Sequence, residues 1–170
     1  MSKIIEAMLQ ELREESAITR RVLERVPSNQ LTWKPHGKSM SLGELALHVA
    51  MIPGNLSKLA QLDEFDAGKA NFAPASPKTL DEVLSGHDQG VREAETILSG
   101  MTDQAAAGDW RLLVNGKPIF TKPRTEVLRS IMQNHWYHHR GQLSVYLRLL
   151  DVPVPVIYGR SADENPFAGL

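Results

Sequence analysis

The chain has 170 residues, no cysteine, six histidines, and 19 basic against 20 acidic residues. This length is typical of a single domain, residues 1–170, which can bury roughly 70% of its unfolded surface without covalent cross-links. The lack of cysteine excludes disulfide frameworks, cysteine-ligated metal sites and a cysteine nucleophile. The balanced charge gives no electrostatic reason to expect nucleic acid or an anionic membrane as the main partner.

The sequence shows neither a targeting signal nor a membrane-spanning segment. The first residues, Met1–Glu6, lead directly into charged sequence and lack the apolar core of a signal peptide. No apolar run approaches the ~20 residues that cross a bilayer. We therefore expect a cytoplasmic protein that has no membrane partner.

The first predicted helix runs from Lys3 to about Val26, and Pro27 ends it. Apolar residues recur along it at helical spacing and define its inward face, namely Ile5, Met8, Leu9, Leu12, Val22, Leu23 and Val26, together with Thr19. We expect the charged residues of its middle part to form a solvated face, and these are Glu11, Arg13, Glu14 and Glu15.

A loop, residues 28–40, precedes the second predicted helix. Ser41 and Glu44 form a capping box pattern, in which each side chain bonds an unpaired backbone N–H of the first turn. The apolar pattern continues to Leu62, but Pro53-Gly54 interrupts it. Because proline removes a helix hydrogen bond and clashes with the preceding turn, we expect a kink or break there.

Breaker residues then predict a loop over 63–78, and Thr79 with Glu82 repeats the capping pattern. The third helix runs from there to Ser99, with Gly100 as its end, and His87 faces inward as a hydrogen-bonded core residue. A fourth helix starts near Pro123 and runs to about Leu150, and an extended tail follows it.

Residues 110–120 have a different pattern. Asn115-Gly116 lies between two short apolar runs, and this pair favours a type I′ turn because both of its residues accept positive φ. Pro118 cannot donate a ladder hydrogen bond, so its strand is placed at an edge. The predicted fold is therefore all-α, a four-helix bundle with a small two-stranded hairpin between helices three and four.

Two histidines of the fourth helix, His135 and His139, stand one turn apart. At 100° per residue both fall on the apolar face of that helix, and His48 falls on the inward face of the second helix. Buried imidazoles need partners, and a metal ion supplies one. Three histidine ligands with open positions are typical of a catalytic rather than a structural site. The alternative is that the histidines are core residues that satisfy one another.

The same angles place Trp136 and Tyr137 away from the core, where they are candidates for contact with a partner helix. His36 lies in a Pro-Gly loop and is expected to be exposed. No general base can be identified. Four residues could line the mouth of the site, but they are also consistent with ordinary surface positions: Asn134, Tyr158, Asp163 and Glu164.

These segments together resemble the DinB family over nearly the full length. The resemblance is carried by Trp33-Lys-Pro-His36, Ser41-Leu-Gly-Glu-Leu-Ala-Leu-His48-Val-Ala, His135-Trp-Tyr-His-His139-Arg-Gly-Gln-Leu, Tyr146-Leu-Arg and Pro153-Val-Pro with Tyr158-Gly. It implies an up-down-down-up bundle, often dimeric, with one divalent ion held by His48, His135 and His139. The family name refers to induction by DNA damage and does not imply DNA binding.

The resemblance implies a metal-dependent enzyme that performs hydrolysis or transfers a low-molecular-weight thiol to a small-molecule substrate. Imidazole ligands suit zinc, nickel, iron and copper. Zn²⁺ is the default ion because of its availability, with Ni²⁺, Fe²⁺ or Mn²⁺ as alternatives. A di-iron carboxylate site is disfavoured, because no Glu-x-x-His pair lies on an inward helix face. The alternative function is a non-catalytic, metal-binding, stress-associated homodimer.

Overall fold

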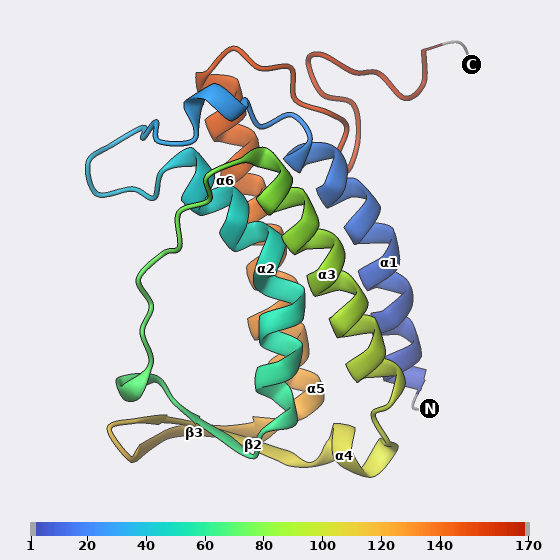
Figure 1. The fold of residues 1–170 in the computed structure, drawn as a ribbon. Helices are drawn as coiled ribbons and strands as arrows, with labels where there is room; N and C mark the ends of the chain where they lie inside the picture. Colours follow the sequence, from blue (N-terminus) through green and yellow to red (C-terminus); the bar gives the residue numbers. More distant parts are fainter. Residues whose placement is uncertain (1–2, 169–170) are drawn as a thin grey trace.

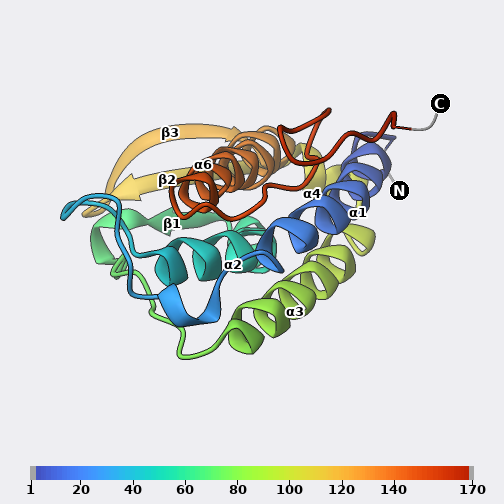
Figure 2. The same ribbon diagram turned by 90° about the horizontal axis from the view of Figure 1, so that it is seen from above.

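The structure is a computed structural model, and it describes residues 3–168. Four long helices lie side by side as a bundle: α1 (Lys3–Leu23), α2 (Leu42–Gln61), α3 (Leu80–Ser99) and α6 (His135–Leu149). In Figure 1, α1 rises, α2 and α3 descend, and α6 rises again. The predicted up-down-down-up bundle is therefore confirmed. Seen from above, α2 lies between α3 and α6 (Figure 2).

The remaining elements are short and connect the long helices. They are η1 (Ser28–Gln30), β1 (Glu64–Asp66), η2 (Ala67–Lys69), α4 (Asp103–Ala107), β2 (Asp109–Val114), β3 (Lys117–Pro123), α5 (Arg124–Val127) and the π-helical segment η3 (Leu128–Asn134). Within residues 3–168, no helix has the length and apolar character needed to cross a bilayer.

The buried face of α1 matches the predicted apolar face, with one charged residue added. Glu15 is 9% exposed and pairs with Arg140 of α6 at 2.5 Å. The prediction that Glu15 belongs to a solvated face is therefore wrong. Its position, three residues after Leu12 and four before Thr19, places it on the same stripe of the helix as these buried residues.

Helix α2 begins with the predicted capping box. The backbone N–H of Ser41 donates to Glu44 Oε2 over 2.6 Å, and the Ser41 hydroxyl accepts from the Glu44 backbone N–H. Of the kink or break predicted at Pro53-Gly54, the break is wrong, since α2 continues to Gln61. Gly54 instead faces α3, where a Cβ on it would lie 2.8 Å from Gly90 Cα. The absence of a side chain at Gly54 thus lets the two helix backbones approach closely.

The predicted hairpin is present as β2 and β3, and both turn residues have positive φ, 52° for Asn115 and 77° for Gly116. The sheet has a third strand, however, because β1 pairs in parallel with β2. Asp66 at the end of β1 accepts the backbone N–H groups of Asn115 and Gly116 and so ties β1 to the hairpin turn. The segment predicted as a loop over 63–78 therefore contributes one short strand.

Candidate metal centre

Three histidine side chains meet where α2 lies against α6. His48 stands on the second turn of α2, while His135 and His139 are one turn apart at the start of α6. One ligand nitrogen from each lies within 4.8 Å of the other two, and the Nε2 atoms of His48 and His135 are 3.4 Å apart. The ring centre of His139 is 4.5 Å from each of the other rings. The structure thus brings together the three histidines that the sequence singled out.

The local sequence places each of these rings. The capping box fixes the first turn of α2 and hence the direction in which His48 points. The π-helical segment η3 ends immediately before His135. In a π-helical turn each hydrogen bond joins residues five positions apart, so the side chains that follow it point in other directions than in a regular α-helix. Such turns are frequent at functional sites.

The π-helical segment also explains why Trp136 and Tyr137 were misplaced. Trp136 is completely buried, and half-buried Tyr137 donates a hydrogen bond to Glu11, so the prediction that both point away from the core is wrong. Steps of 100° per residue do not hold across η3. The buried stripe of α6 is formed by Trp136, Arg140, Leu143 and Leu147. The two histidines lie half-buried beside this stripe rather than at its centre.

Two of the three rings also form a hydrogen bond outside the three-histidine cluster, with a residue of α6 or η3. The Nδ1 atom of His139 lies 2.7 Å from the amide oxygen of Gln142, and the ring of His135 bonds the backbone of Ile131. Neither partner was singled out from the sequence. A glutamine three residues after a histidine faces the same side of a helix, so this spacing is the signal that was missed.

All three histidines have a pKa below the usual value. Burial is the main cause for each, and it lowers the pKa of His48 to about 4, with the neighbouring His139 and His135 adding to the effect. The pKa values of His135 and His139 are also lowered, mainly by burial. The three imidazoles are therefore neutral at pH 7, and each keeps a lone pair on one ring nitrogen.

The other histidines take different places. His36 is exposed in its loop, as predicted, and its Nδ1 accepts from the Lys38 backbone N–H. His87 is 3% exposed in the core, with Nδ1 3.3 Å from Asp88 Oδ1, whereas its Nε2 has no partner. His138 is exposed beside the three-histidine cluster. The three-histidine cluster is thus the one such metal-ligand group within residues 3–168.

The residues considered for the mouth of the site have other partners. Tyr158 bonds Arg140 and Glu15, and Asp163 and Glu164 accept from the backbone N–H groups of Val154 and Val156 while pairing with arginines. These contacts hold the C-terminal tail against α1 and α6. Asn134 is simply exposed. Within the described chain, the hydrogen bonds of Tyr158, Asp163 and Glu164 do not reach the three-histidine cluster.

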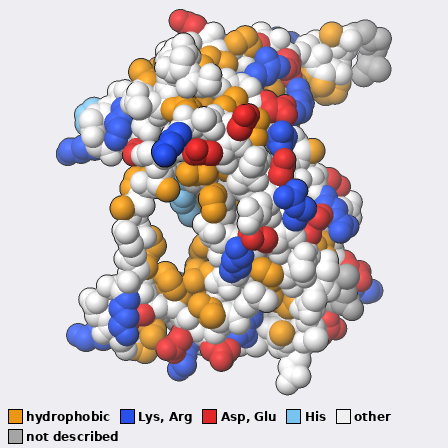
Figure 3. Space-filling view, viewed as in Figure 1, with side chains coloured by type: hydrophobic (Ala, Val, Ile, Leu, Met, Phe, Trp, Pro, Cys, Tyr) orange, Lys and Arg blue, Asp and Glu red, His pale blue; other side chains and the backbone are white. Residues whose placement is uncertain are grey.

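The molecular surface has an opening beside α2. Figure 3 shows a gap between α2 and the crossover segment, residues 70–79, with histidine atoms and hydrophobic side chains at its rim. The crossover carries no charged side chain from Ala70 to Pro77. Its far end is held to α2, since the Ser76 hydroxyl donates to Glu44. The three clustered histidines are only partly buried, so solvent reaches part of each ring.

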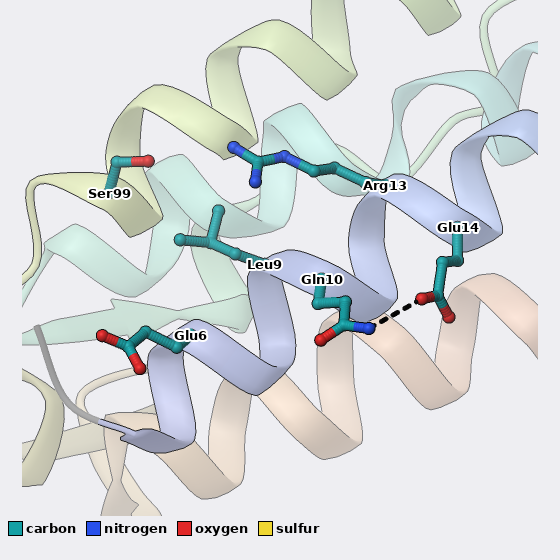
Figure 4. A pocket seen from close by; sticks show the side chains of 6 residues that line it. All are labelled: Glu6, Leu9, Gln10, Arg13, Glu14 and Ser99. Atoms are coloured by element: carbon teal, nitrogen blue, oxygen red, sulfur yellow. Dashed lines mark hydrogen bonds between the residues drawn. The ribbon is translucent and has the colours of Figure 1, made fainter.

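A separate surface hollow of about 480 Å³ lies between α1 and α3 (Figure 4). Its lining includes none of the histidines, and consists of Glu6, Leu9, Gln10, Arg13, Glu14 and Ser99. Gln10 and Glu14 bond each other across one helical turn, and Arg13 pairs with Glu95. Three of the polar groups at this hollow are thus already paired, and we read it as an ordinary groove between two helices.

Solved structures share this fold. A DinB-like protein from Bacillus subtilis matches with a TM-score of 0.67 at 16% identity, covering 88% of this chain and 96% of the other. A DinB-like protein from Bacillus cereus gives 0.66 at 22% identity, with 90% and 97% covered. A mutant of a mycothiol-dependent maleylpyruvate isomerase gives 0.53 at 14% identity, with 92% and 65% covered. At these identities the likeness shows the fold alone.

No curated protein matches the sequence. The sequence model of the DinB family, in contrast, matches residues 1–166, which include all three clustered histidines. With the bundle topology and the solved DinB-like structures, this match shows that the chain belongs to the DinB family.

Proposed function

We propose that His48, His135 and His139 hold one divalent metal ion and that the protein is a metal-dependent enzyme acting on a small molecule. The observation that carries this proposal is the convergence of three neutral imidazoles, each half-buried, with a ligand nitrogen of each within 4.8 Å of the others. Three imidazoles that pack together lose hydrogen bonds to water, and their contacts with one another do not replace all of these bonds. A bound cation, in contrast, accepts the lone pair of each ring.

The donor set fits such an ion. Imidazole nitrogen suits Zn²⁺, Ni²⁺ and Fe²⁺, and three protein ligands leave coordination positions open, as in catalytic sites. Zn²⁺ is the first choice, with Ni²⁺, Fe²⁺ and Mn²⁺ as alternatives. A bound divalent ion supplies Lewis acidity, which lowers the pKa of a bound water or thiol and polarises a substrate group. The chain itself holds the ion, limits water through the half-buried setting and admits substrate by the opening beside α2.

Of the two reactions considered, thiol transfer has the additional support of a fold relative. That relative is a mycothiol-dependent isomerase, so its reaction depends on a thiol. Our chain has no cysteine, so any reacting sulfur must come from the substrate. Hydrolysis of a small ester or amide is the second reaction to test.

Elemental analysis of protein purified without an affinity tag tests the metal site. We expect about one divalent ion per chain in the wild type, and a large loss in the His135→Ala variant. The exposed neighbour provides a matched control, because His138→Ala should retain the ion. Equal metal content in all three proteins would place the ion elsewhere, and no metal in any of them would overturn the proposal.

A screen for activity then separates an enzyme from a metal-binding protein without catalysis. The metal-loaded protein is offered thiol cosubstrates with electrophilic acceptors and, separately, hydrolysable esters and amides. Turnover in the wild type that disappears in His135→Ala supports the enzyme. A loaded protein that is silent across the screen would favour the non-catalytic, stress-associated alternative.

A further inference from the structure

Gln142 determines which nitrogen of His139 is available. Its amide oxygen lies 2.7 Å from His139 Nδ1. A carbonyl oxygen accepts hydrogen bonds and cannot donate them, so Nδ1 must carry the proton. The lone pair of the ring is therefore on Nε2, and the ring cannot rotate about its Cβ–Cγ bond without losing this hydrogen bond.

His135 is held in a similar way from the opposite direction. Its ring bonds the backbone of Ile131, one turn earlier in η3, while its Nε2 faces His48 Nε2 at 3.4 Å. One anchor thus precedes the histidine pair and the other follows it. The two α6 ligands are oriented before any ion binds, and both outer anchors are uncharged amide groups.

The absence of charge in these anchors is informative, because ligating histidines often donate to a carboxylate, which makes the imidazole more basic. The three-histidine group contains no carboxylate within the described chain. The acidic residue one turn before His48 is Glu44, and it is engaged by the Ser41 backbone, Ser76 and Lys34. An ion held here therefore keeps its full double positive charge.

We propose that Gln142 is a positioning residue that fixes His139 for metal binding and, by being neutral, makes the site favour an anionic ligand such as a thiolate. This inference rests on the proposed metal site. It narrows the substrate class to molecules that present an anionic donor atom to the ion. The neutral histidines and residues 70–77 of the crossover add no negative charge that would repel such a donor.

Two substitutions at position 142 separate the two roles. Gln142→Glu keeps an oxygen acceptor for His139 Nδ1 but adds a negative charge, whereas Gln142→Met removes the acceptor at similar size. Gln142 is exposed, so both variants should fold, and thermal unfolding of the metal-free proteins checks this. Gln10→Met is the matched control, because Gln10 is also an exposed helical glutamine bonded to a side chain one turn away.

Co²⁺ is the metal probe, followed by its visible absorption and by competition with a chelating dye. We expect Gln142→Met to bind Co²⁺ about 10–100-fold more weakly than the wild type. Gln142→Glu should bind Co²⁺ at least as tightly as the wild type. Gln10→Met should not differ from it. Equal affinity of Gln142→Met and the wild type would overturn the positioning role.

Azide and imidazole, added to the Co²⁺-loaded proteins, report the preference for an anion over a neutral ligand. The ratio of azide affinity to imidazole affinity should fall about tenfold in Gln142→Glu, because the added charge lies close to the ion. An unchanged ratio would overturn the charge argument while leaving the metal site intact. A wild type that binds no Co²⁺ at all would overturn the proposed function, and this inference with it.

Discussion

Arg140 is a charged side chain that is almost completely removed from water. It is 1% exposed, pairs with Glu15 at 2.5 Å, and donates to the hydroxyl groups of Thr19 and Tyr158. The rings of Tyr137 and Tyr158 lie within 5.2 Å of its guanidinium carbon. This network joins α1, α6 and the C-terminal tail, so it holds together segments that are far apart in the sequence.

Removing one member of this network should be costly. Arg140→Met leaves the Glu15 carboxylate buried without its partner, and we expect a loss of about 3–5 kcal/mol in the free energy of unfolding. Arg13→Met breaks the exposed pair with Glu95 and should cost less than about 1 kcal/mol. Urea denaturation of the two variants measures both. Similar costs would show that burial of the Arg140 pair does not matter.

Half-buried His48 and buried His87 should make the metal-free protein sensitive to acid. Burial lowers the pKa of His48 to about 4 and also lowers that of His87. The unfolded chain then binds protons near the usual histidine pKa of about 6.5, whereas the folded chain does not. The contribution of these residues to the free energy of unfolding is therefore complete above about pH 6.5 and is lost as the pH falls toward 4.

Urea denaturation with a chelator present, at about pH 7.5, 5.5 and 4.5, tests whether the stability decreases as the pH falls. The free energy of unfolding should fall steadily across the series. It should fall less steeply in His48→Gln, because one of the responsible groups has been removed. His36→Gln, which changes an exposed loop residue, should follow the wild type. A wild type whose stability rises with acid would contradict the argument.

At the scale of elements, the contact of α2 with α3 depends on a pair of glycines. A Cβ on Gly54 would lie 2.8 Å from Gly90 Cα, which is backbone and cannot move aside. We expect Gly54→Ala to reduce the free energy of unfolding by about 1–3 kcal/mol, even though alanine favours helix. Thermal or urea unfolding gives the value.

The control for this prediction is Gly86→Ala in α3. A Cβ there would meet Leu47 and Met51 at 3.7 Å or more, an ordinary contact distance. The better helix propensity of alanine should then stabilise the protein by up to about 1 kcal/mol. The two glycine substitutions should thus act in opposite directions, and a stabilising Gly54→Ala would contradict the close approach.

Elements with a local cause were predictable from the sequence. The capping box of α2 and the Asn115-Gly116 turn depend on residues three or fewer positions apart. Strand β1 depends instead on pairing with β2 about fifty residues later, which no local pattern shows. The π-helical segment has no sequence signature either, and its changed periodicity misplaced Trp136. The prediction for His135 and His139 survived this error because their four-residue spacing lies entirely within α6.

At the scale of the whole molecule, the expected homodimer remains a prediction. Trp136 is completely buried and cannot contribute to an interface. On the same helix, Val145 and Leu149 are 57% and 59% exposed and stand one turn apart, so they are the better candidates. Sedimentation velocity should show a dimer that Val145→Lys weakens. A monomeric wild type at micromolar concentration would remove the prediction.

Metal binding should stabilise the entire bundle, because its ligands come from helices that are far apart in the chain. His48 belongs to α2, whereas His135 and His139 belong to α6, so the ion crosslinks the second and the last of the four long helices. A ligand that binds only the folded state at about 100 times its Kd adds about 2.7 kcal/mol. For a chain of this length, that corresponds to a rise in Tm of about 5–11 °C.

Thermal unfolding with and without Zn²⁺ measures this rise, and two variants show where the ion acts. His48→Gln should lose most of the Zn²⁺-dependent shift, because the remaining two histidines lie on one helix and no longer link α2 to α6. His138→Gln removes an exposed histidine beside the cluster and should keep the full shift. A shift that persists in His48→Gln would mean that the ion binds α6 alone and does not hold the two helices together.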